Sequence, residues 1–212
     1  MLWLLLVSAM ALVIFRAVDT TLFHALPAPL AVLADVRVTS LLVLVALCVA
    51  APSARALLAW PHRSPSRRVV VLCVVVVAIA CVAPALTGVG IVALPRWQDR
   101  LAFHVVGVVN EELLCRALVL GAALAVWPRS SGSTSTLREP AVIATTIVFS
   151  LLHAQYHGFV AGPALYAQLL WTLPTGLALT ALAFETRSVW PAVGVHVVNN
   201  ALVGVAELVR SA

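Results

Sequence analysis

Long apolar runs separated by short polar stretches are the main pattern of this chain. Each run is continuous and far longer than the roughly 9–11 residues of a transmembrane β-strand, which favours helices. A membrane-spanning helix needs about 20 apolar residues, so the pattern predicts about seven spans, with a range of roughly six to eight because two runs are short. The predicted spans are Leu2–Val18, Val38–Ala51, Val69–Leu94, Leu101–Trp127, Ala141–Tyr156, Phe159–Phe184 and Val189–Val209.

The pattern therefore predicts an all-α fold, a multi-pass transmembrane helical bundle in which residues 1–212 form a single integral membrane domain. We expect Leu2–Val18 to be retained rather than removed as a signal peptide, because no basic residue precedes it and no clear small-x-small cleavage site follows. The third predicted helix is long enough to tilt or break near Pro84 and Gly88. The sixth is predicted to be interrupted by Pro163 and Pro174.

Composition strengthens the membrane interpretation. Hydrophobic residues make up 63% of the chain and charged residues 10%, whereas a soluble domain has about 45–50% and about 25%. These values exclude a disordered chain, a coiled coil and an ordinary cytosolic enzyme. The formal net charge is +5, but the basic residues lie mostly between apolar runs, where they orient membrane proteins. We therefore expect a lipid bilayer as partner, and no nucleic acid.

The distribution of arginine predicts an orientation. The loop after the second predicted span carries the densest basic cluster, and three further arginines fall on the same side of the membrane. These residues are Arg55, Arg63, Arg67 and Arg68, with Arg129, Arg138 and Arg187. The positive-inside rule then places this side and the N-terminus in the cytoplasm. We expect the protein to lie in the plasma membrane of a prokaryote.

The four cysteines are interpreted as apolar packing residues. They lie inside apolar runs and none forms a C-x-x-C pair, so we expect no disulfide framework. Cys115 lies beside a charged cluster, but no histidine is three or four residues away. The sequence therefore does not favour a thiol nucleophile at this position.

Ionisable residues inside membrane helices are costly and mark functional sites. The fourth span contains Asn110-Glu111-Glu112-Leu-Leu-Cys-Arg116 near its middle. Glu112 and Arg116 are four residues apart, so they share a helix face and can form an ion pair. Glu111 is rotated about 100° away and faces another neighbour. A structural charge network would account for Glu112 and Arg116, but Arg116 alone cannot offset both carboxylates.

Two further polar clusters follow on later helices. Phe149-Ser-Leu-Leu-His153 ends the fifth span. The seventh span contains His196 and Asn200, which share a face at a spacing of four residues. Taken singly, each of these residues could be a satisfied core histidine or an amide that holds two helices together.

Together the three clusters supply a carboxylate, two imidazoles and an amide, the groups needed to activate a water molecule inside a membrane. The carboxylate takes a proton from water, and an amide or a protonated imidazole stabilises the oxyanion of an attacked peptide carbonyl. A divalent metal such as zinc, held by Glu111, His153 and His196, would also fit this chemistry. Their different depths in the membrane require short, tilted or re-entrant helices.

At these residues the chain resembles the CPBP intramembrane protease family, the CAAX protease and bacteriocin-processing group that includes the Ras-converting CAAX endopeptidase. The resemblance covers the motif-bearing half of the chain, Leu101–Val209. It depends on three motifs in order: E-E-x-x-x-R at Glu111, Glu112 and Arg116, F-x-x-x-H at Phe149 and His153, and H-x-x-x-N at His196 and Asn200.

The resemblance implies an all-helical membrane endopeptidase that hydrolyses peptide bonds. It implies that Glu111 is the general base and that Glu112 supports it. It further implies that His153 holds and activates the water, and that His196 and Asn200 stabilise the oxyanion. The implied supporting residues are Arg116, paired with Glu112, and Phe149, a packing position. The family has been described both with and without an obligatory metal.

Two other functions use the same residues. A non-catalytic scaffold or bacteriocin self-immunity factor on the same fold would need the helices but not the Glu111 carboxylate. A small transporter would need buried Glu and His for ion coupling, but the chain shows no inverted repeat. The peptidase hypothesis predicts a peptide or membrane-protein substrate.

Overall fold

A computed structural model describes residues 36–87, 102–127, 135–154 and 160–211. The predicted first span Leu2–Val18 lies outside the described residues, as do Gly88 and the end of the predicted third span. Within the described ranges all of the regular secondary structure is helical. The elements are α2 (Val36–Ala50), α3 (Pro52–Leu57), α4 (Arg67–Thr87), η2 (Ala102–Gly107), α6 (Val108–Glu112), η3 (Leu113–Val119), α7 (Leu120–Val126), η4 (Thr136–Arg138), α8 (Pro140–Ala154), α9 (Pro163–Thr186) and α10 (Trp190–Ser211).

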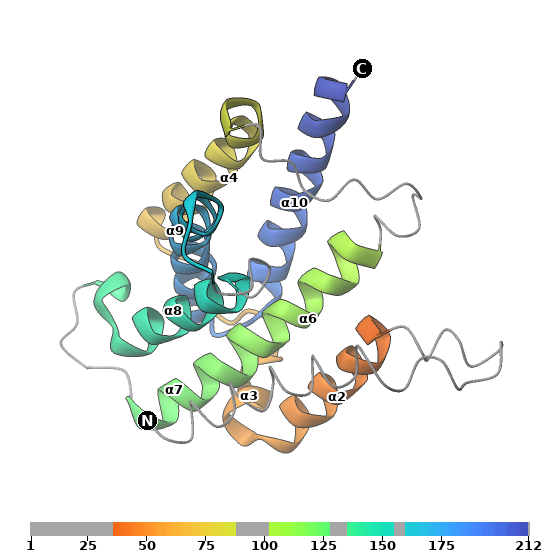
Figure 1. The fold of residues 1–212 in the computed structure, drawn as a ribbon. Helices are drawn as coiled ribbons and strands as arrows, with labels where there is room; N and C mark the ends of the chain where they lie inside the picture. The colour runs from red at the N-terminus through yellow and green to blue at the C-terminus, as the bar shows by residue number, and fades with distance from the viewer. Residues whose placement is uncertain (1–35, 88–101, 128–134, 155–159, 212) are drawn as a thin grey trace, which may run out of the picture.

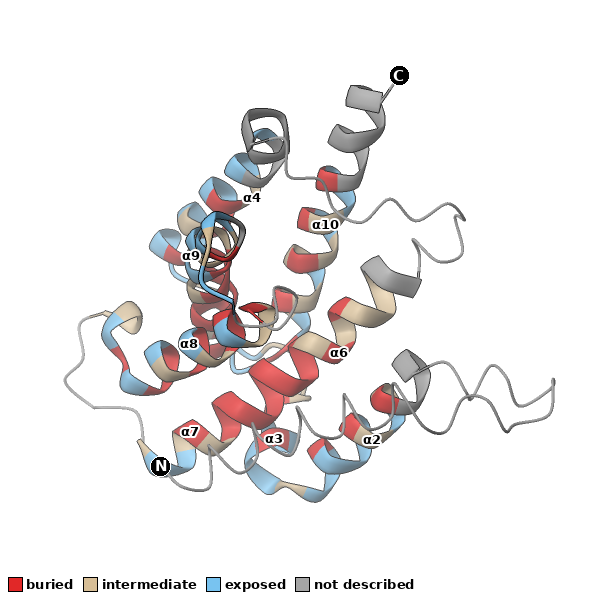
Figure 2. Cartoon of the chain, in the orientation of Figure 1, coloured by how far each residue is buried: buried red, intermediate tan, exposed pale blue. Residues whose placement is uncertain are grey.

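The helix formed by α6, η3 and α7 is the centre of the described structure (Figure 1). It contacts α2 and α3 on one side and α8 and α10 on the other. Residues 112–121 on this helix are all buried, and Figure 2 shows them as a continuous buried segment. Glu112 and Arg116 of the first motif lie in this buried segment, and Glu111 lies at its edge.

Helix α9 packs along α8, and α4 packs against both α9 and α10 (Figure 1). The larger apolar cluster joins these helices through residues such as Val76, Val142, Leu179 and Ala192. Many large aliphatic side chains on the opposite faces are exposed, for example Val74 at 62% and Leu170 at 78%. One helical stretch among the described residues, Leu165–Thr186, is long and apolar enough to cross a membrane, and Ser40–Ala50 and Pro140–Ala154 are shorter apolar helices.

The prediction of a break in the sixth span is wrong, because α9 is one helix from Pro163 to Thr186. Pro163 lies in its first turn, where the missing N–H is one of the groups that lack an intrahelical partner in any case. Pro174 lies inside the helix. Beside it, the Thr175 hydroxyl donates to the Trp171 carbonyl oxygen at 3.0 Å, a side-chain bond of the kind that supports a proline-containing helix.

The segment expected to be a loop after the second span contains a helix, α3. Pro52 occupies its first turn, and its buried residues Ala54 and Leu57 face the bundle. Gly121 allows this packing, because a Cβ there would lie only 3.0 Å from the Ala54 backbone nitrogen. Arg55, counted as a loop residue in the orientation argument, is therefore an exposed residue of a short helix.

Hydrogen bonds join the ends of helices that are distant in sequence. The Glu185 carboxylate accepts bonds from the Ser66 backbone N–H at 2.6 Å, the Ser66 hydroxyl at 3.0 Å and the Thr136 hydroxyl at 2.7 Å. It thereby caps the start of α4 and fixes η4 against α9. In the same part of the fold, the indole N–H of Trp190 donates to the Leu58 carbonyl oxygen at 2.8 Å. These bonds fix the start of α10 and, through it, the position of His196.

Candidate active site

Helix α6 carries both glutamates between two segments wound with i→i+5 turns, η2 before it and η3 after it. Such π-helical turns are rare in proteins overall, and those that occur are often found at functional sites. Asn110 on the same helix is buried and donates to the Ser40 hydroxyl on α2 at 2.9 Å. This bond fixes the position of α6 against its neighbour on the side away from the histidines.

The predicted ion pair between Glu112 and Arg116 is present. The two charged atoms, Glu112 Oε1 and Arg116 Nη1, are 2.9 Å apart, and both side chains are 0% exposed. A buried carboxylate without a partner would be strongly unfavourable, so each charge requires the other. The pair thus forms a fixed, fully buried support for the polar cluster.

The same oxygen of Glu112 lies 2.8 Å from Nδ1 of His196, which α10 brings in from 84 residues away in sequence. A carboxylate can only accept a hydrogen bond, so Nδ1 of His196 carries a proton and donates the hydrogen bond to Glu112. This bond directs the other ring nitrogen, Nε2, toward Glu111 at a distance of 3.9 Å. Glu112 therefore orients the His196 ring.

His153 is oriented in a similar way by its own helix. Its Nδ1 lies 2.8 Å from the Phe149 carbonyl oxygen, which can only accept a hydrogen bond. Its Nε2 therefore faces Glu111 Oε2, at a distance of 3.8 Å. His153 lies in the last turn of α8, and its packing there brings its ring beside Glu111.

Glu111 is the most accessible member of the cluster, with 30% of its side chain exposed against 14% for His153 and 6% for His196. Its Oε2 atom faces both imidazole Nε2 atoms. The rotation away from Glu112 that the helical spacing predicts thus directs this carboxylate toward the two histidines. Three polar atoms from α6, α8 and α10 converge on one place.

The Phe149 ring is the packing centre of the site. Its centroid lies 4.4 Å from the His153 ring centroid and 6.1 Å from the His196 ring centroid. The Arg116 guanidinium lies over its face at 4.0 Å, within the range of a cation–π contact. Phe149 is 1% exposed, and its ring packs between these neighbours and Gly176 on α9.

Asn200 lies on α10 one turn after His196. Its Oδ1 accepts a bond of 3.4 Å from Nδ2 of the buried Asn199. Because the Asn200 oxygen accepts this bond, the NH₂ group of Asn200 remains directed away from Asn199. The predicted site residues Glu111, Glu112, Arg116, Phe149, His153 and His196 are brought together, and Asn200 follows on the helix that carries His196.

Glu111, His153 and His196 are also the predicted metal ligands. Across the described part of the chain, no group of three or more His, Cys, Asp and Glu side chains is arranged to hold a metal ion. Nδ1 of His153 is held by the Phe149 carbonyl oxygen, and Nδ1 of His196 is held by Glu112. Metal assistance through Glu111, His153 and His196 therefore stays a prediction.

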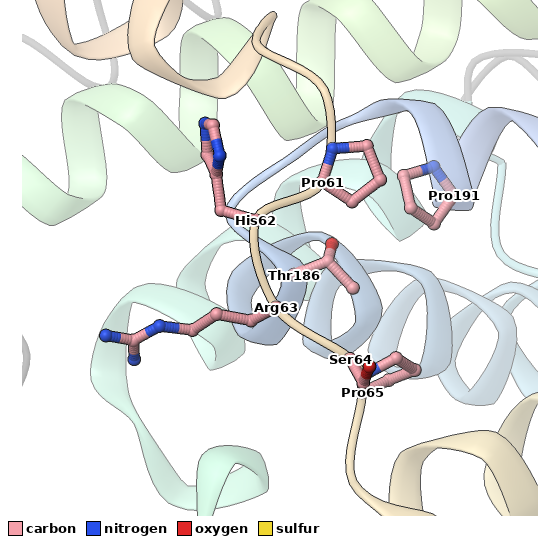
Figure 3. A pocket seen from close by; sticks show the side chains of 7 residues that line it. All are labelled: Pro61, His62, Arg63, Ser64, Pro65, Thr186 and Pro191. Carbon is pink, nitrogen blue, oxygen red and sulfur yellow. The ribbon is translucent and has the colours of Figure 1, made fainter.

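A pocket of about 370 Å³ lies in another part of the fold (Figure 3). It is formed by the segment between α3 and α4 and by the facing ends of α9 and α10. None of the predicted catalytic side chains lines it. Its lining residues are Pro61, His62, Arg63, Ser64, Pro65, Thr186 and Pro191.

The described residues form a helical protein in which two glutamates and two histidines converge, an arrangement suited to hydrolysis. Residues 93–202 match the family model described as type II CAAX prenyl endopeptidase Rce1-like. The chain belongs to this family of membrane-integral proteases, and the matched range contains all three motifs. Searches among curated proteins and among solved structures found no match.

Proposed function

We propose that the protein is an intramembrane endopeptidase that hydrolyses peptide bonds with a water molecule activated by Glu111. The observation that carries this proposal is the convergence of Glu111 Oε2 on the Nε2 atoms of His153 and His196, at 3.8 and 3.9 Å. These separations are too long for direct hydrogen bonds, but they suit atoms that share a water at about 2.8 Å from each. The structure thus supports a water site next to the general base.

The proposed reaction has two steps. Glu111 takes a proton from the water as its oxygen attacks the peptide carbonyl carbon, and the carbonyl oxygen becomes an oxyanion. Protonated His196, held by Glu112, and the Asn200 amide donate hydrogen bonds to that oxyanion. The C–N bond then breaks, and Glu111 returns its proton to the leaving amine. His153 holds the water in line for attack.

The membrane setting is supported by the fold and by the family. Exposed aliphatic residues on α2, α4, α8 and α9 provide apolar faces that lipid would cover. We propose a bundle of about seven spans with the arginine-rich end of α3 and α4 in the cytoplasm. Because the family description names a CAAX prenyl endopeptidase, a peptide with a prenylated C-terminal motif is the first substrate to test.

The experiment is cleavage of fluorogenic peptides, with and without a prenyl group, by detergent-purified protein. Wild type, Glu111→Ala and His196→Ala would be compared, with Arg63→Gln as an exposed control outside the cluster. The peptidase proposal predicts cleavage by wild type and the control, and its loss in both site variants. Cleavage by Glu111→Ala at the wild-type rate would contradict it. A function retained by Glu111→Gln in cells would instead favour a non-catalytic scaffold.

A chelator added to the same assay addresses the metal. A water activated by Glu111 without a metal predicts an unchanged rate. Loss of cleavage in chelator, restored by zinc, would show that a metal assists.

A further inference from the structure

Helices α8 and α9 run side by side in opposite directions behind the site. Thr136, just before α8, contacts Glu185 near the end of α9, whereas Phe149 lies against Gly176, nine residues earlier on α9. At Phe149, α9, which carries none of the three motifs, touches the catalytic cluster.

Gly176 leaves no room for a side chain at this contact. A Cβ there would lie 2.8 Å from Phe149 Cδ1 and 3.5 Å from both Cγ and Cε1. Ordinary contacts of a Cβ atom begin at 3.4 Å, so the ring would have to move by about 0.6 Å. The glycine is buried in the middle of a 24-residue helix, where glycine is less favourable than alanine.

The Phe149 ring cannot move away from α9 without disturbing the site. Arg116 lies 4.0 Å over its face, and the His153 ring centroid is 4.4 Å from its own. Phe149 also supplies the carbonyl oxygen that holds Nδ1 of His153. A displaced ring therefore shifts the guanidinium that pairs with Glu112, the imidazole that faces Glu111, or both.

We propose that Gly176 is a positioning residue, which sets the place of Phe149 and through it the geometry of Arg116 and His153. This inference rests on the proposed peptidase function for its effect on rate. Displacements approaching 1 Å can reduce catalysis by about 100-fold. We therefore expect Gly176→Ala to lower kcat by about 10- to 100-fold while KM changes by less than about twofold.

The chain offers a matched control at Gly194 on α10. Gly194 is exposed, has nothing within 4 Å of a built Cβ, and is two residues from His196. Gly194→Ala adds the same methyl group to a motif-bearing helix without a clash. We expect it to keep wild-type kcat and KM.

The experiment is a double-mutant cycle with Gly176→Ala, Phe149→Leu and the double variant, assayed below the unfolding temperature of every variant. Phe149→Leu removes the ring that the added methyl group would strike. We expect Gly176→Ala to lower kcat in the wild-type background and to have little further effect in the F149L background. A simple loss of helix stability would instead lower activity by the same factor in both backgrounds.

Three results would overturn the proposal: an unchanged kcat in Gly176→Ala, an equal loss in Gly194→Ala, or additive effects in the cycle. The same cycle measured by thermal unfolding tests the contact without any substrate. There, Gly176→Ala should lower the unfolding temperature in the wild-type background and not in the F149L background. If wild type cleaves no peptide but this coupling is found, the peptidase proposal fails and the Gly176–Phe149 contact stands.

Discussion

Glu111 and Glu112 are adjacent in sequence, yet their surroundings predict different effects of the same substitution. Glu112 is 0% exposed, and its Oε1 bonds both Arg116 and His196. Glu112→Gln keeps the size of the side chain but leaves the buried Arg116 without an anionic partner. Breaking a buried ion pair in this way costs about 3–5 kcal/mol. In a chain of this length, Tm falls by about 2–4 °C for each kcal/mol of stability lost, so Tm should fall by about 6–20 °C.

Glu111→Gln should affect catalysis and leave folding intact. Glu111 is 30% exposed, and its nearest imidazole nitrogens are 3.8 and 3.9 Å away. Partly exposed ion pairs of this kind contribute about 0–1 kcal/mol, so Tm should fall by less than about 4 °C. Loss of the general base should lower the cleavage rate by about 100- to 10,000-fold.

Thermal unfolding of detergent-purified variants can be followed with a thiol-reactive dye, because Cys48, Cys73 and Cys115 are buried and free. Peptide cleavage is measured on the same samples at low temperature. The predicted result is a stable, inactive Glu111→Gln and an unstable Glu112→Gln. If the two variants unfolded at the same temperature, or if Glu111→Gln were the less stable one, the assignment of Glu112 as the buried support would be refuted.

Further variants test other parts of the structure. His153→Ala and His196→Ala should each lower kcat by about 100-fold or more, because each removes an imidazole from the water site; single-turnover kinetics at saturating substrate would check this, and wild-type kcat in either would contradict it. Glu185→Ala should lower stability by about 1–2 kcal/mol through loss of the α4 cap, without changing kcat per folded molecule; a Tm equal to wild type would count against the cap. Ser64→Cys, in the exposed segment before α4, should react with a membrane-impermeant maleimide only after cells are permeabilised; labelling in intact cells would reverse the predicted orientation.

Local spacing was sufficient to predict the parts of the site that lie on one helix. Four-residue separation predicted the Glu112–Arg116 pair, and the observed 2.9 Å distance confirms it. The rotation of Glu111 away from that pair also follows from helical geometry. The convergence of Glu111, His153 and His196 could be expected only from the order of the three motifs, because periodicity does not say which helices are neighbours.

Other features depend on contacts that no local pattern encodes. Glu185 caps α4 across 119 residues, and nothing in its surrounding sequence marks it as a capping residue. Gly176 carries no motif, and its importance comes from the Phe149 ring on another helix. Pro174 was expected to interrupt α9, but tertiary packing of a 24-residue apolar helix outweighs the local cost of one proline.

The most direct test of the central claim is cleavage in ¹⁸O-labelled water, with the products weighed by mass spectrometry. Wild type and Glu111→Gln would be compared at equal folded concentration, with a peptide that wild type cuts. Hydrolysis by a water activated at Glu111 predicts one ¹⁸O in the new carboxylate of the wild-type product, and no product above background from Glu111→Gln. Labelled product formed equally fast by Glu111→Gln would contradict that role for Glu111.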